Sequence, residues 1–153
     1  MLTKLEIQNY ILIDQLSIDL SSQLSVITGE TGAGKSIIMG ALGLILGDRA
    51  DSTVCRDASK KCFIEGVFQL SNKNQYATFF KEHEIDLTDE LIIRREITAQ
   101  GKSRAFINDS PVTLTILKDL TSKLVDLHQQ FDTLALGDTD FQRTVLDLSL
   151  IHI

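Results

Sequence analysis

Residues 29–36 read Gly29-Glu30-Thr31-Gly32-Ala33-Gly34-Lys35-Ser36, which fits the pattern G-x-x-x-x-G-K-[ST] at every constrained position. Glycines let the backbone bring its N–H groups around phosphate oxygens without a Cβ in the way. The ammonium group of Lys35 would reach the β- and γ-phosphates, and the hydroxyl of Ser36 would ligate Mg²⁺. The motif therefore predicts that all eight residues bind a nucleoside triphosphate, ATP with Mg²⁺.

The segments on both sides of the motif agree with this prediction. Residues 24–28 form an apolar run that stops at Gly29, which predicts a buried strand. After the motif, apolar residues recur at helical spacing over 37–45, and Gly47 is placed to end that helix. Gly40 and Gly43 inside the helix indicate close packing against a neighbour. A strand, a glycine-rich loop and a helix N-terminus are the order that phosphate binding requires.

The rest of the chain alternates between strand and helix patterns. Strands are expected around 5–7, 16–20 and 64–70, followed by a hairpin of 91–97 with 104–107; helices are expected at 76–83 and, after an N-cap at Thr113, over 114–127. Residues 108–111 predict a turn. No repeat or linker divides these elements, so the sequence predicts one mixed α/β unit.

Composition excludes several classes of protein. The chain has 153 residues, 43% of them hydrophobic, which is too apolar for a disordered chain. Cys55 and Cys62 are too few for a disulfide scaffold, and no apolar run approaches the roughly 20 residues of a membrane span. Fifteen basic against 21 acidic residues give a net charge of −6, which argues against a surface that is basic all over. Without an export signal at the N-terminus, a cytoplasmic protein is expected.

The order of elements resembles the ATP-binding-cassette heads of the structural-maintenance-of-chromosomes (SMC) type, and more closely the bacterial RecN family of DNA repair proteins. The stretches that carry this resemblance are 5–10, 27–37, 46–51, 103–108 and 124–130. It covers nearly all of residues 1–147. The implied fold class is an α/β P-loop NTPase: the N-terminal lobe of an ABC/SMC-type head, incomplete, with a mixed sheet, an antiparallel β subdomain and the P-loop helix.

The resemblance also implies roles for single residues. It matches Gln130 to the Q-loop glutamine, which would hold Mg²⁺ together with Ser36 and position the attacking water, so Lys35 and Gln130 are the implied catalytic residues. Gln129 and Phe131 replace the family's glycine and histidine at their positions, which leaves open whether Gln129 or Gln130 acts. Two solvated glutamines at a helix end are the alternative. The implied partners are ATP, DNA, a C-terminal head lobe and a second head in a homodimer, in the bacterial cytoplasm near the nucleoid.

Basic residues gather on the predicted hairpin: Arg94, Arg95, Lys102 and Arg104. Such a ribbon could contact DNA phosphates without reading sequence, and a solvated hairpin face is the alternative. The resemblance places Arg49 near the nucleotide or a DNA-facing surface, and Asn9 with Tyr10 near the adenine. An exposed helix-end arginine and a simple turn are the respective alternatives.

Two motifs that such heads need are not found in residues 1–153, namely a Walker B Asp-Glu pair and a Leu-Ser-Gly-Gly signature. We therefore expect this chain to bind ATP weakly and not to hydrolyse it, while the parent protein is an ATPase. Residues 148–153 match a translated sequencing adapter and are expected to be a non-native tail, with a native strand as the alternative. The other functions considered are a P-loop kinase or small-molecule phosphotransferase, and a non-hydrolysing interaction module.

Overall fold

The computed structural model describes residues 1–29, 33–125 and 127. In chain order the elements are β1 (Leu2–Tyr10), β2 (Ile13–Asp19), α1 (Ala33–Ile45), the 3-10 helix η1 (Ser52–Val54), β3 (Cys62–Gln69), the 3-10 helix η2 (Lys73–Gln75), α2 (Ala77–Glu82), β4 (Glu90–Ile97), β5 (Ser103–Ile107), β6 (Ser110–Val112) and α3 (Leu114–Leu124). In this part of the chain, no helix has the length and apolar character that a bilayer crossing needs.

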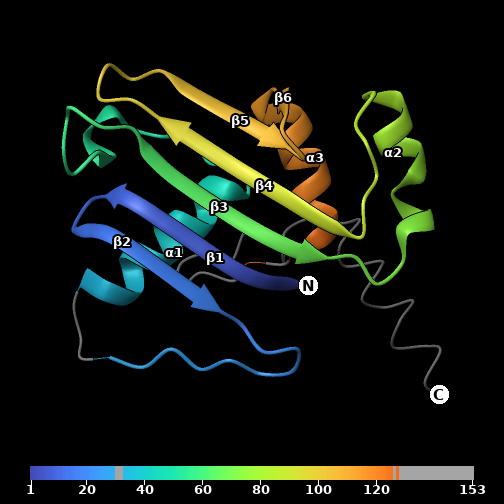
Figure 1. Ribbon diagram of the computed structural model, residues 1–153, viewed down its shortest axis with the longest axis horizontal. Helices are drawn as coiled ribbons and strands as arrows, with labels where there is room; N and C mark the ends of the chain where they lie inside the picture. Colours follow the sequence, from blue (N-terminus) through green and yellow to red (C-terminus); the bar gives the residue numbers. More distant parts are fainter. Residues whose placement is uncertain (30–32, 126, 128–153) are drawn as a thin grey trace, which may run out of the picture.

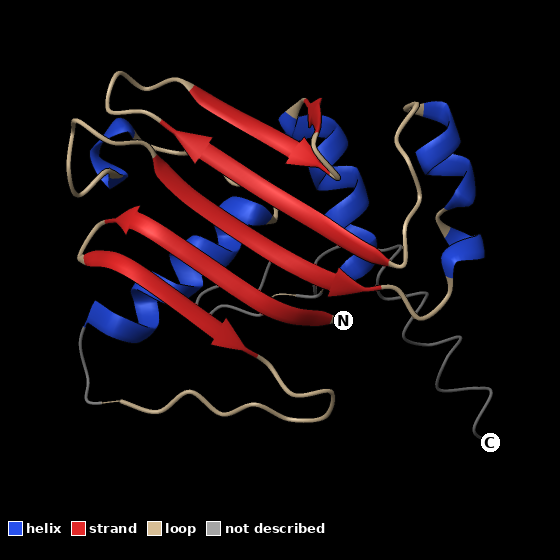
Figure 2. Cartoon of the chain, in the orientation of Figure 1, coloured by secondary structure: helices blue, strands red, loops and turns tan. Residues whose placement is uncertain are grey.

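The six strands of the described residues form one sheet in the order β2-β1-β3-β4-β5-β6, and each neighbouring pair is antiparallel. The antiparallel β subdomain expected from the sequence is therefore present. Figures 1 and 2 show α1 and α3 against one face of this sheet, while no described helix covers its other face. We call that other side the open face.

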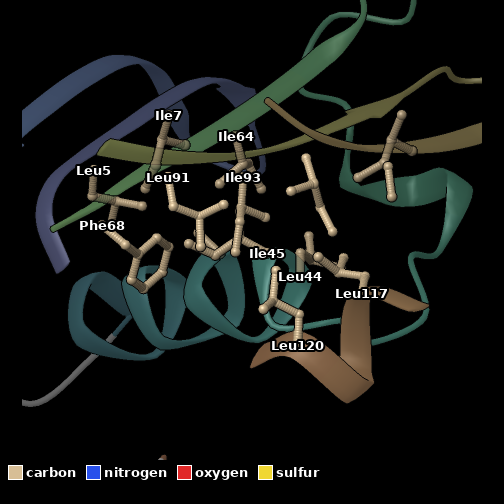
Figure 3. Close-up of a cluster of buried hydrophobic side chains, with 14 of the residues drawn as sticks. Leu5, Ile7, Leu44, Ile45, Ile64, Phe68, Leu91, Ile93, Leu117 and Leu120 are labelled. Carbon is tan, nitrogen blue, oxygen red and sulfur yellow. The ribbon is translucent and has the colours of Figure 1, made fainter. Parts of the chain in front are cut away.

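The core lies between the sheet and these two helices (Figure 3). Every second residue along a strand points to the same face, so the apolar alternation of the sequence directs one set of side chains to the helices. The buried set includes Leu5, Ile7, Ile64, Phe68, Leu91 and Ile93 from the strands, and Leu44, Ile45, Leu117 and Leu120 from the helices. Burial of these side chains, each contributing roughly 1.5–3 kcal/mol, fixes α1 on the sheet.

The predicted hairpin and helix cap are confirmed. β4 and β5 pair around a turn at 98–102, and the Thr113 hydroxyl accepts a hydrogen bond from the Ile116 N–H at 3.3 Å. The turn expected over 108–111 is shorter than the sequence indicated. Ser110 already belongs to β6, and Asn108 and Asp109 alone connect β5 to β6. Both have positive φ, 46° and 63°, which is the conformation of a tight two-residue hairpin turn.

The prediction of a buried strand over 24–28 is wrong for this structure. These residues form no strand, and the side chains of Leu24 and Val26 are 79% and 72% exposed. An apolar run becomes a buried strand only when neighbouring strands supply its hydrogen bonds and cover its faces. Among the described residues nothing does so for this segment.

Candidate nucleotide-binding site

The glycine-rich motif ends in the first turn of α1. Ala33 begins the helix, and Gly34, Lys35 and Ser36 are exposed in its first turn; 30–32 lie outside the described residues. The Lys35 ammonium group donates a hydrogen bond to the Gly29 carbonyl oxygen at 3.1 Å. The side chain therefore reaches back across the motif and joins its two ends.

This arrangement suits an anion. The first turn of α1 contains no acidic residue, so no carboxylate within that turn opposes the positive end of the helix dipole. A Cβ added at Gly29 or Gly34 would meet no atom within 4 Å, so the space beside both glycines is open. With an ammonium group and a serine hydroxyl beside the N–H groups of this turn, the donor set matches a polyphosphate with its Mg²⁺.

The opposite end of α1 is fixed by a glycine. The Asp48 N–H donates to the Gly43 carbonyl at 2.9 Å and the Gly47 N–H to the Leu44 carbonyl at 3.3 Å. With φ of 108° at Gly47, these two bonds form a Schellman motif, so the predicted helix end is confirmed. The Thr121 hydroxyl of α3 caps one further carbonyl, that of Leu46, at 2.7 Å.

Arg95 of β4 binds carbonyl groups at this end of α1, so the prediction that it belongs to an exposed basic ribbon is wrong. Its side chain is 0% exposed. The guanidinium donates to the carbonyls of Leu44 at 2.7 Å and Asp48 at 2.9 Å, and to the Ser103 hydroxyl at 2.6 Å. Burial lowers the pKa of Arg95. Adjacent strand residues face opposite sides of a sheet, so Arg95 lies with Ile93 and Ile97 on the buried face and does not contact DNA.

Arg94 lies on the open face, where acidic neighbours surround it. Its guanidinium approaches the carboxylates of Asp109 at 2.9 Å, Glu96 at 3.5 Å and Glu65 at 3.9 Å, and lies 4.6 Å from the centre of the Phe106 ring. Burial raises the pKa of Glu65 despite Arg94. The prediction that Arg94 presents its charge to DNA therefore fails, while Lys102 and Arg104 remain exposed.

Asn9 and Tyr10 make contacts that hold parts of the fold together. The Asn9 side chain holds the 57–60 loop through bonds to the Asp57 and Lys60 backbone. Tyr10 is 4% exposed, and its hydroxyl lies 2.6 Å from where a Cβ at Gly40 would be, so it packs between the sheet and α1. The close packing predicted for Gly40 is confirmed. Asn9 and Tyr10 end strand β1, so the alternative of a simple turn is wrong for them, and the contact with adenine stays a prediction.

The other predicted site residues have varied positions. Arg49 is exposed just beyond the end of α1. The suggested Mg²⁺ ligand Gln130, its neighbour Gln129 and the tail 148–153 lie outside the described residues. Cys62 is buried, which raises the pKa of its thiol to about 12, and no disulfide joins it to Cys55.

Comparison with known proteins places the chain in a family. Residues 4–145 match the family model described as AAA domain, so the chain belongs to that family of nucleotide-binding domains. It is similar to the DNA repair protein RecN of Haemophilus influenzae, at 40% identity over 99% of this chain and 28% of that protein. The RecN proteins of Vibrio cholerae and Bacillus subtilis are 40% and 37% identical over 96% of this chain and 26% of theirs.

The match is to the N-terminal part of RecN, so the chain spans about a quarter of its curated relatives. Solved structures agree on the fold. A chain described under "Structural biochemistry of ATP-driven dimerization and DNA stimulated activation of SMC ATPases" superimposes with a TM-score of 0.65 at 23% identity, covering 95% of this chain and 97% of that one. The SMC head domain of Thermotoga maritima gives 0.57 at 21% identity, covering 78% and 41%. The fold is therefore that of the N-terminal lobe of an SMC-type ATPase head.

Proposed function

We propose that this chain binds ATP at residues 29–36 as the N-terminal head lobe of a RecN-like ATPase that acts in the repair of DNA double-strand breaks and in recombination. The observation that carries the proposal is the bond from Lys35 to the Gly29 carbonyl, beside the first turn of α1. This bond holds the Lys35 ammonium group across the motif, where the proposal places the triphosphate. The similarity to the DNA repair protein RecN supports a role in DNA repair. We place this role in the bacterial cytoplasm, at the nucleoid.

Each residue of the motif then has a role in binding. The backbone N–H groups of the loop and of the first turn of α1 donate to phosphate oxygens, and Lys35 exchanges its bond to Gly29 for the β- and γ-phosphates. Ser36, with Gln130 as the second residue, would hold Mg²⁺. The ion's chemistry is to neutralise charge on the phosphates; the chain's own part is to bind and orient them.

Hydrolysis requires parts that we place in the longer protein. The curated relatives are about four times as long as this chain, and we assign the Walker B pair and the signature motif to their remaining length. ATP held between two heads would then drive their engagement. The ATP-driven dimerization named for the SMC structure, whose fold this chain shares, supports this step.

The exposed segment 24–28 supports the same view. Leu24, Val26 and Ile27 present apolar side chains to solvent directly before the motif. We infer that a strand of the C-terminal head lobe pairs with this segment. Amide hydrogen exchange at 24–28 should be fast in this chain and slow when a RecN C-terminal lobe is co-expressed with it; equal exchange would contradict the inference.

The substitution Lys35→Ala tests ATP binding directly. Loss of the charge-assisted bonds to phosphate should weaken binding of a fluorescent ATP analogue, in the presence of Mg²⁺, by roughly tenfold or more. Lys81→Ala removes an exposed lysine on α2 and is the matched control, which should bind as the parent chain does. Equal affinity of both variants would refute the proposed site, as would the absence of ATP binding by the parent chain.

A further inference from the structure

A small cationic hollow lies at the turn end of the β4–β5 hairpin, separate from the nucleotide motif. Its volume is about 100 Å³, and it is lined by Lys61, Glu96, Thr98, Lys102 and Arg104. We call it the hairpin notch. Three basic side chains against one carboxylate leave it with a net positive charge, although the whole chain carries −6. The notch is therefore a local exception to the acidic surface.

The backbone holds the lining residues in place. The Thr98 N–H donates to the Lys102 carbonyl and the Gly101 N–H to the Thr98 carbonyl, both at 2.9 Å, so the turn is closed. The Lys102 N–H also donates to the Thr98 hydroxyl oxygen at 3.3 Å. A Cβ added at Gly101 would come within 3.8 Å of Ser52, so the turn lies against η1. Lys102 thus projects from a supported turn.

The single carboxylate of the notch is already paired. Glu96 lies 3.3 Å from the Lys61 ammonium group and 3.5 Å from Arg94 Nε. Arg104 is the cross-strand neighbour of Glu96, yet neither it nor Lys102 makes an ion pair within the described part of the chain. Two unpaired cations beside a hydroxyl on an exposed turn fit an anion from outside.

The size and lining indicate which anion. A volume of about 100 Å³ is roughly that of three waters, enough for one phosphate group and too little for a nucleotide. No aromatic side chain lines the notch, so it offers nothing on which a base could stack. Glu96 and Arg104 alternate with the buried Arg95 and Ala105 along β4 and β5, so they lie on the open face. The helix α1 lies against the other face (Figure 1). A polyanion could therefore reach the notch without meeting the nucleotide.

We propose that the hairpin notch binds one backbone phosphate of double-stranded DNA through Lys102, Arg104 and Lys61. The identity of the polyanion rests on the proposed function in DNA repair; the notch itself rests on its geometry. It replaces the ribbon that the sequence suggested, because Arg95 is buried and Arg94 is paired. Contact to a single phosphate fixes position on the duplex without reading its sequence.

The experiment uses the full 153-residue chain and a fluorescein-labelled 20-base-pair duplex, with fluorescence anisotropy measured between 50 and 200 mM salt. The double variant Lys102→Gln with Arg104→Gln should bind about tenfold more weakly. Its slope of log affinity against log salt should also fall by about 0.9, the value for one phosphate. The matched control is Lys81→Gln with Lys118→Gln, which changes the net charge equally at exposed positions on α2 and α3. It should bind within about twofold of the parent.

Several results would overturn the proposal. Equal weakening of both double variants would show general electrostatic attraction, and an unchanged notch variant or a parent chain that binds no DNA at 50 mM salt would remove the site. Saturation by inorganic phosphate alone would make it a site for free phosphate, and tighter binding of an RNA duplex would overturn the assignment to DNA. ATP binding is measured on the same samples, so loss of ATP binding with DNA binding intact refutes the nucleotide site and leaves the notch.

Discussion

Removal of Arg95 should cost far more stability than removal of its neighbour Arg94. In Arg95→Ala the carbonyls of Leu44 and Asp48 lose a buried donor, at roughly 1–2 kcal/mol each. Loss of the buried aliphatic part of the side chain costs about 2 kcal/mol more. The variant no longer has to bury a charged group, which restores about 1–2 kcal/mol of stability. The expected net loss is about 3 kcal/mol. Arg94→Ala loses partly exposed ion pairs and the contact with the Phe106 ring at the open face, together about 1 kcal/mol.

Urea unfolding followed by circular dichroism measures both changes. Arg95→Lys should lie between the parent and Arg95→Ala, because an ammonium group keeps the charge but cannot donate to three acceptors in a planar fork. If Arg95→Ala loses no more stability than Arg94→Ala, the reasoning that a buried guanidinium fixes the end of α1 is refuted.

Three further outcomes follow from single positions. Gly47→Ala should lose about 1–2 kcal/mol in urea unfolding, because its φ of 108° strains any other residue and the new Cβ meets Lys118; an unchanged midpoint would contradict this. In the native chain a thiol reagent should modify Cys55, while Cys62, fully buried with a pKa near 12, should react only on unfolding; labelling of both at equal rates would contradict the described packing. Burial raises the pKa of Glu65 from 4.5, so the stability it contributes is present below that value and is lost as the pH rises through the raised pKa. The free energy of unfolding of Glu65→Gln, relative to that of the parent, should therefore rise between about pH 4 and about pH 7 in urea unfolding. A stability difference that shrinks with rising pH would disprove the raised pKa.

Local chemistry made much of this protein predictable. The glycines, Lys35 and Ser36 predict a phosphate-binding motif, because the type and spacing of residues alone determine which donors can surround an anion. Phosphate binding there stays a prediction. The end of α1 at Gly47 and the cap at Thr113 were equally predictable, since both depend on the backbone preferences of one or two residues. The strands of the hairpin followed from their period of two.

The predictions that failed depended on partners distant in sequence. Residues 24–28 have the composition of a buried strand, but a strand needs a neighbour, and composition does not supply one. Arg95 looked like one cation of a ribbon; its pairing with the Leu44 carbonyl, 51 residues away, exists only because α1 crosses behind β4. The alternation of Ile93, Arg95 and Ile97 carried a signal of burial, whereas the carbonyls that compensate the buried charge come from the tertiary structure. Sequence thus determined the local conformations and the chemistry of the motif, and the packing of α1 on the sheet decided which charges face solvent.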